Sequence, residues 1–113
     1  MPTTSYKNSM KAMVDRNPEM ATEMLEDALN ALLSGNLEEG RLLLRQYINA
    51  TIGFKELAQR TGKQDKNLMR SLSEAGNPTA ANLFEIIQAC VKAEGVTVAA
   101  QVMPQSDRPA LVP

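Results

Sequence analysis

The fold is decided between residues 56 and 72, where the chain reads ELAQRTGKQDKNLMRSL. A leucine–alanine pair is followed four residues later by Gly62, and two further leucines lie beyond a polar, basic segment. This pattern predicts a short helix over 54–60, a sharp turn, and a second helix over about 64–73. Because such a turn requires a positive φ, which glycine adopts at little cost, Gly62 is the expected turn residue.

Two short helices joined by a glycine turn form a helix-turn-helix, in which the second helix can enter the major groove of DNA. Leu57 and Leu68 are expected to hold the pair against the core, and Ala58 must be small because the two helices cross there. The outer face of the second helix begins at Gln64 and reaches Arg70, and both side-chain types can contact base edges. The same geometry occurs in proteins that never touch DNA, so plain helical packing stays open as an alternative.

The rest of the chain predicts an all-α fold. Apolar residues recur at helical spacing in three longer segments, each with an Asn or Thr positioned to cap it, and these segments cover residues 17–33, 36–50 and 79–94. Residues 1–16 show no clean periodicity and are expected to form a flexible arm. In the last part of the helical domain, which spans 17–102, the β-branched alternation of 96–102 could form a short strand. Residues 103–113 carry three prolines and are expected to be disordered.

Composition restricts the class of protein. The chain has 113 residues, of which 43% are hydrophobic and 4% aromatic, and this suits one helical domain with a core of Leu, Ile, Met and Ala. Histidine is absent, and the lone cysteine, Cys90, lies in an apolar helical stripe where a core role is favoured over chemistry. No nucleotide-binding loop, nucleophile–base set or acid–base pair is visible, so neither an enzyme nor a cofactor is expected. Without a membrane-spanning apolar run or a signal peptide, a cytoplasmic protein is expected.

Charge is segregated along the chain, although the formal net charge is only −1. Residues 17–40 hold six acids and no base, whereas residues 55–70 hold five bases against two acids. This segregation indicates that the basic segment faces an anion and that the acidic helix is turned away from it. The first acids follow helical spacing, which favours a solvated face over a metal site and leaves the docking of a basic partner protein open; they are Glu19, Glu23, Glu26 and Asp27.

Several short motifs occur between residues 53 and 89. They are Leu57-Ala58, Thr61-Gly62, the run Leu68-Met69-Arg70-Ser71-Leu72-Ser73, and Gly76-Asn77-Pro78-Thr79. In this order and spacing they resemble the HigA-type antitoxins, also called addiction-module antidote proteins, of the Cro/CI (XRE) helix-turn-helix superfamily. The resemblance is weaker upstream to Glu23 and downstream to Val98, and it covers about two-thirds of the chain. The sequence departs from the family pattern at four positions, Lys63, Met69, Asn82 and Phe84.

The resemblance implies a five-helix, λ-repressor-like domain that forms a homodimer and binds a palindromic DNA operator. It further implies a transcriptional regulator that represses its own operon and neutralises a RelE/HigB-like ribonuclease toxin. Two alternatives stay open from the residues alone. One is a stand-alone prophage-type repressor without a toxin, and the other is a helical protein-interaction module that has lost DNA binding.

The candidate DNA-binding residues fall into two groups. Four side chains on the outer face of the second helix are expected at base edges, namely Gln64, Asp65, Lys66 and Arg70, and Met69 is a further DNA-binding candidate on the same face. Asp65 is unfavourable near phosphate, and it could instead accept from cytosine or cap the helix. Residues of the turn and of the loop before the last helix are expected at phosphates, because basic side chains and backbone N–H groups bind anions: Arg60, Thr61, Lys63, Asn77 and Thr79.

Overall fold

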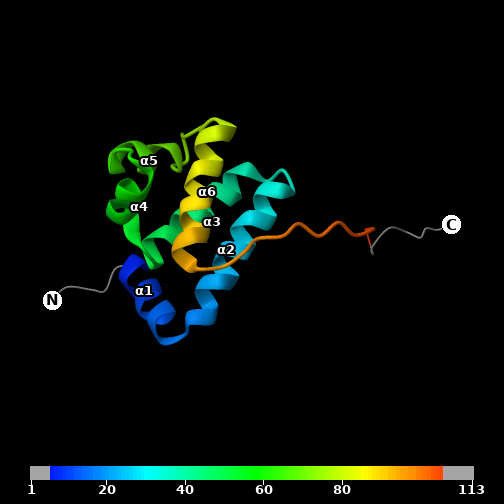
Figure 1. The fold of residues 1–113 in the computed structure, drawn as a ribbon, viewed down its shortest axis with the longest axis horizontal. Helices are drawn as coiled ribbons and strands as arrows, with labels where there is room; N and C mark the ends of the chain where they lie inside the picture. The colour runs from blue at the N-terminus through cyan, green and yellow to red at the C-terminus, as the bar shows by residue number, and fades with distance from the viewer. Residues whose placement is uncertain (1–5, 106–113) are drawn as a thin grey trace.

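The structure, a computed structural model, describes residues 6–105, and within them it is all-α with six helices and no strand (Figure 1). The helices follow one another through short connections, and the sixth runs through the middle of the view in Figure 1. Their bounds are α1 Tyr6–Arg16, α2 Pro18–Leu33, α3 Leu37–Ala50, α4 Gly53–Thr61, α5 Asp65–Ser71 and α6 Ala80–Glu94.

Helices α2 and α3 form a hairpin with the most extensive contact of any helix pair in the described chain. Gly40 of α3 is buried against Leu32 of α2, and a Cβ atom at this position would collide with the Leu32 side chain. The absence of a side chain at Gly40 therefore lets the two helices approach each other. Their inner faces supply part of the core, including Ala28 and Leu44, which are fully buried.

The remaining helices close over this hairpin. Leu57 of α4 and Leu68 of α5 are 0% and 2% exposed, and Ile86 and Cys90 of α6 lie in the same hydrophobic cluster. The predicted burial of these leucines is confirmed. Each fully buried leucine contributes about 1.5–3 kcal/mol relative to an exposed one, so the two short helices are held mainly by their apolar faces.

The predicted flexible arm is wrong over residues 6–16, which form α1, so the described chain has six helices where five were expected. Val14 joins the core at 7% exposure, Met10 packs against it one turn earlier, and α1 contacts α2 and α3. No acid occupies its first turn, and only this short apolar stripe identifies the helix in the sequence. Residues 1–5 lie outside the described part of the chain.

The strand considered over 96–102 is not formed. Residues 96–105 have no regular secondary structure, and a strand requires a neighbouring strand that this chain does not supply among its described residues. Val96 still packs against the core after Gly95 ends α6. Most of the tail predicted to be disordered, residues 106–113, lies outside the described part. No helix within residues 6–105 has the length and apolar character needed to cross a membrane.

Candidate nucleic-acid interface

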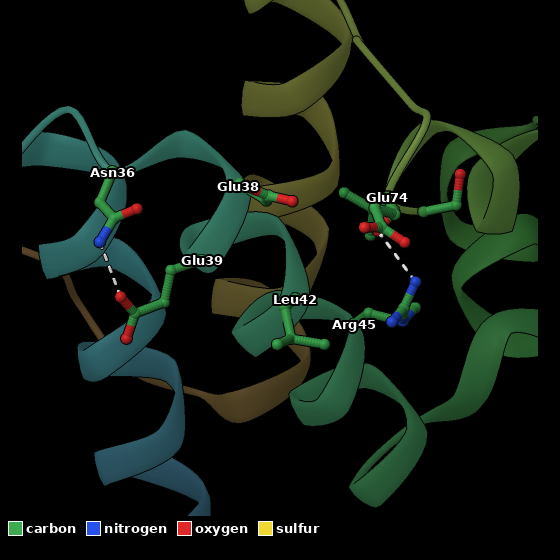
Figure 2. Close-up of a pocket in the computed structure, with 8 residues that line it drawn as sticks. Asn36, Glu38, Glu39, Leu42, Arg45 and Glu74 are labelled. Carbon is green, nitrogen blue, oxygen red and sulfur yellow. Dashed lines mark hydrogen bonds between the residues drawn. The ribbon is translucent and has the colours of Figure 1, made fainter.

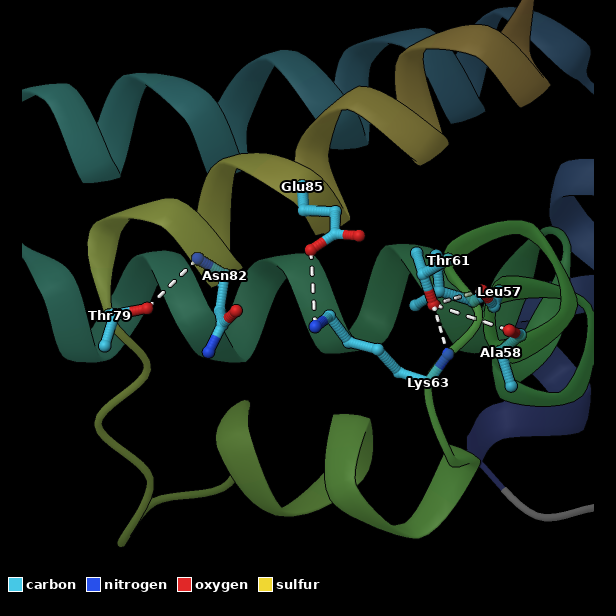
Figure 3. A network of polar contacts seen from close by, with 7 residues as sticks. All are labelled: Leu57, Ala58, Thr61, Lys63, Thr79, Asn82 and Glu85. Atoms are coloured by element: carbon cyan, nitrogen blue, oxygen red, sulfur yellow. Dashed lines mark hydrogen bonds and ion pairs between the residues drawn. The ribbon is translucent and has the colours of Figure 1, made fainter.

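The turn between α4 and α5 follows the glycine pattern predicted for it. Gly62 caps α4 with φ +72° in the left-handed region, and its N–H donates to the carbonyl oxygen of Ala58 at 2.9 Å. The predicted positive φ is therefore confirmed. Thr61 is the last residue of α4, and its Oγ1 donates to the Leu57 carbonyl oxygen one turn back on the same helix, at 2.9 Å (Figure 3). The Thr61 hydroxyl is thus used within the fold rather than left free for phosphate.

The outer face of α5 carries the candidate base-reading residues. Lys66 and Arg70 are exposed one helical turn apart, and Met69 between them is 43% exposed. Neither cation forms an ion pair within residues 6–105. The structure therefore brings three of the predicted residues together on one exposed, cationic helix face.

At the amino end of α5, the neighbouring candidates Gln64 and Asp65 differ in exposure. Gln64 is the N-cap residue, exposed and extended at φ −78° and ψ 140°, and its side chain makes no capping hydrogen bond. Asp65 is the first helical residue and half-buried, and it lines a hollow of about 380 Å³ together with Lys55 and Met69. A carboxylate in the first turn stabilises the helix dipole, which gives Asp65 a structural role without DNA.

Two candidate cations are paired with acids of the same chain. Arg60 Nη2 lies 2.8 Å from Glu56 Oε2, one turn earlier on α4. Lys63 Nζ lies 3.3 Å from Glu85 Oε1 on α6 (Figure 3). Both pairs are partly exposed, and such pairs contribute only about 0.2–1 kcal/mol, so a phosphate could compete for either cation. Sequence reasoning missed Glu85 because it lies 22 positions after Lys63, on another helix.

The remaining phosphate candidates lie at the start of α6. Thr79 is its N-cap residue, and the Thr79 Oγ1 accepts a hydrogen bond from the Asn82 N–H at 3.1 Å, which confirms the predicted cap. Figure 3 shows this cap at the end of α6 that lies away from Thr61. Asn77 is exposed in the preceding loop. The ten candidates thus come from two parts of the chain, the α4–α5 pair with its turn and the loop that leads into α6.

Gly76 was named only as part of a motif, and the structure gives it a specific role. A Cβ atom at Gly76 would collide with the backbone carbonyl oxygens of Arg70 and Ser71. Its N–H donates to the Ser73 carbonyl oxygen at 2.9 Å. The loop therefore passes directly over the carboxyl end of α5 and fixes where that helix stops.

An acidic hollow of about 450 Å³ lies between α3 and the loop after α5 (Figure 2). Glu38, Glu39 and Glu74 line it beside Leu42, and Arg45 reaches across to the Leu72 carbonyl oxygen at 3.4 Å. Within residues 6–105 no three acidic, histidine or cysteine side chains are placed to hold a metal ion. The acids Glu19, Glu23, Glu26 and Asp27 of α2 are all exposed, as a solvated face requires.

Cys90 is fully buried, as its apolar stripe predicted. Burial raises the pKa of its thiol to about 12, with Glu94 adding to the effect, so the thiol is protonated at neutral pH. Burial and a hydrogen bond from its hydroxyl to Glu94 also raise the pKa of Tyr47. This pair ties α3 to the end of α6 and has no connection to the α5 face.

Comparisons of the chain with models of protein families, with curated proteins and with solved structures found no match.

Proposed function

We propose that the protein is a sequence-specific DNA-binding transcriptional regulator, with α4 and α5 as its helix-turn-helix in a λ-repressor-like domain. The observation that carries this proposal is the exposed face of α5, where Lys66 and Arg70 stand without acidic partners in the described chain, directly after a left-handed glycine turn. A recognition helix requires this combination of an exposed cationic face and a buried apolar face.

Each exposed residue of α5 would take a different part in binding. The planar guanidinium of Arg70 can donate to the O6 and N7 atoms of one guanine, and the amide of Gln64 can pair with an adenine edge. Lys66 was grouped with the base-edge candidates, but its ammonium is a flexible point charge that suits a phosphate contact. Asn77 and the backbone at the start of α6 offer further phosphate contacts.

The antitoxin role extends this proposal by resemblance to the HigA-type family. In that role the protein would act as a homodimer, repress its own operon and neutralise a RelE/HigB-like toxin. The acidic face of α2 supports it, because Glu23, Glu26 and Asp27 are exposed and none forms an ion pair with a side chain of residues 9–105. Such a face repels DNA and attracts a cationic protein.

A binding titration against the DNA immediately upstream of the protein's own gene tests the proposal. We expect binding to this DNA to be tighter than to a scrambled sequence of equal length and composition, and to weaken steeply with salt. Replacing Glu23, Glu26 and Asp27 together by Gln is the matched control, and it should leave DNA affinity unchanged or slightly raised. Equal, weak binding to both DNAs would remove the claim of sequence specificity.

One observation favours a second candidate, a helical protein-interaction module without DNA binding. Arg60 and Lys63 are already paired with Glu56 and Glu85, which lowers the positive charge available around the turn. Absence of any binding to the upstream DNA at low salt would support this candidate. A stand-alone repressor would bind the DNA yet have no adjoining reading frame for a short basic protein.

A further inference from the structure

The hollow of about 380 Å³ that Asp65 lines lies beside the α5 face, and part of its lining is apolar. Ile52 comes from the connection between α3 and α4, Phe54 from the first turn of α4, and Met69 from α5. Phe54 is 7% exposed and Ile52 is half-buried against the core, whereas Met69 is 43% exposed. Met69 therefore belongs both to the apolar lining of this hollow and to the exposed face of α5.

The rest of the lining is polar. Asn49, Lys55 and Asp65 contribute an amide, an ammonium and a carboxylate group. Lys55 is exposed and forms no ion pair with a side chain of residues 9–105. Gly53 also lines the hollow and adds no side chain to it. The hollow therefore offers an apolar surface together with hydrogen-bonding groups, and it is continuous with the α5 face through Met69.

The major-groove edges of DNA carry one kind of apolar group. Every base pair presents hydrogen-bond donors and acceptors there, and only thymine adds a methyl group, at C5. A thymine–adenine pair thus combines an apolar group with donors and acceptors, as the lining of the hollow does. Lys66 precedes Met69 by three residues and Arg70 follows it directly. An α5 helix that brings both cations into the groove therefore carries Met69 to the base edges with them.

We propose that the hollow beside α5 is, through Met69, a subsite for the C5-methyl group of a thymine in the operator. The inference rests on the proposed function, because it requires α5 to lie in the major groove. Contact removes the methyl group and part of the Met69 side chain from water, which favours thymine over cytosine at that position. Removal of this one methyl group should weaken binding about fourfold, the factor that corresponds to burial of one aliphatic carbon.

The test replaces thymine by uracil, which pairs with adenine in the same way and lacks only the C5-methyl group. The probe is a duplex with the sequence immediately upstream of the protein's own gene, prepared with each thymine replaced singly and titrated with the full chain. For the wild type we expect one or more thymines at which uracil raises Kd about fourfold.

The titration separates this inference from the proposed function. Binding to the upstream duplex that is no tighter than binding to scrambled DNA refutes both. If the upstream duplex is bound specifically, and no single uracil raises Kd by more than about 1.5-fold, the methyl subsite is refuted and the proposed function stands.

Three variants assign the methyl effect to Met69. Met69→Gln keeps the length of the side chain and makes its end polar, so it should bind the thymine and uracil duplexes equally at the sensitive position. Met69→Leu keeps an apolar side chain and should retain most of the difference. Met13→Ala is the matched control, because Met13 is also 43% exposed but lies on α1 and does not line the hollow.

All three variants should bind scrambled DNA as the wild type does, because none changes a charge. A full fourfold effect in Met69→Gln, or its loss in Met13→Ala, overturns the assignment of the methyl group to this hollow.

Discussion

Two glycines flank α5, and substitution of each tests a different physical requirement of the candidate interface. Gly62 has a φ of +72°, and an added Cβ atom would have no neighbour within 4 Å. Gly76 has no such backbone requirement, but its Cβ atom would collide with the carbonyl oxygens of Arg70 and Ser71. Position 62 therefore requires a residue that tolerates a positive φ, and position 76 requires a residue without a side chain.

The effect of Gly62→Ala on stability follows from backbone conformation in the folded and the unfolded chain. A left-handed conformation costs a residue with a Cβ atom about 1–2 kcal/mol. Lower entropy of the unfolded chain offsets about 0.4–1 kcal/mol of this, which leaves a net loss of about 1 kcal/mol in the free energy of unfolding. For a domain of this size that loss lowers Tm by about 4–8 °C. Gly62→Asn should cost less than Gly62→Ala, because asparagine tolerates the left-handed region.

Gly76 should show the opposite order. Gly76→Ala forces the loop away from the backbone at the end of α5, at a cost of about 1–3 kcal/mol, and Gly76→Asn should cost more because it is larger. Urea denaturation followed by far-ultraviolet circular dichroism measures all four variants. If asparagine is no better than alanine at position 62, or is better than alanine at position 76, the assignment of strain to one glycine and contact to the other is refuted.

Three further predictions concern the core and the α5 face. Leu68→Ala should lower the free energy of unfolding by about 2–5 kcal/mol in urea denaturation, whereas Met69→Ala, exposed beside it, should change it by less than about 0.5 kcal/mol. Arg70→Ala should lose about 1–3 kcal/mol of binding free energy on operator DNA and relax the preference at one base pair. Lys66→Ala should weaken binding to operator and scrambled DNA equally and reduce the salt dependence of binding by about one ion. Equal small losses on both DNAs for both variants would argue against base readout. The thiol of Cys90 should react with a thiol reagent at pH 8 only after denaturation. Because burial raises the pKa of this thiol to about 12 in the folded protein, the unfolded chain loses the thiol proton first, and the free energy of unfolding should fall as pH rises toward 12. Reaction of the native protein at pH 8 would contradict the burial of Cys90.

The sequence predicted the helices that carry strong local signals. Gly62 predicted a turn because glycine by itself favours the left-handed conformation that ends α4. Thr79 predicted a helix start because its hydroxyl caps an N–H only three residues later in the chain, at Asn82. The leucines of α4 and α5 were identified as core residues because their spacing matches the helix period. These features depend on neighbours in the chain, and a single sequence contains them.

The features that were missed depend on distant contacts. Helix α1 is fixed by packing of Val14 against other helices, and its own residues give little helical signal. The pairing of Lys63 with Glu85 joins two helices, and it changes the charge of the candidate interface in a way that a count over residues 55–70 cannot show. The segment after α6 had the alternation of a strand, but a strand forms only where another chain segment pairs with it.

The length of α5 affects how the proposed recognition helix would behave in solution. With seven residues and Leu68 as its one buried side chain, α5 has little to hold it when the molecule fluctuates. Its amides should therefore exchange with deuterium through local opening, at a free energy below that of α2 and α3, which are in extensive contact. DNA would have to order this helix as well as contact it, so part of the binding free energy would offset the entropy lost by α5. The protection from deuterium exchange that is gained on binding should therefore be concentrated in α5.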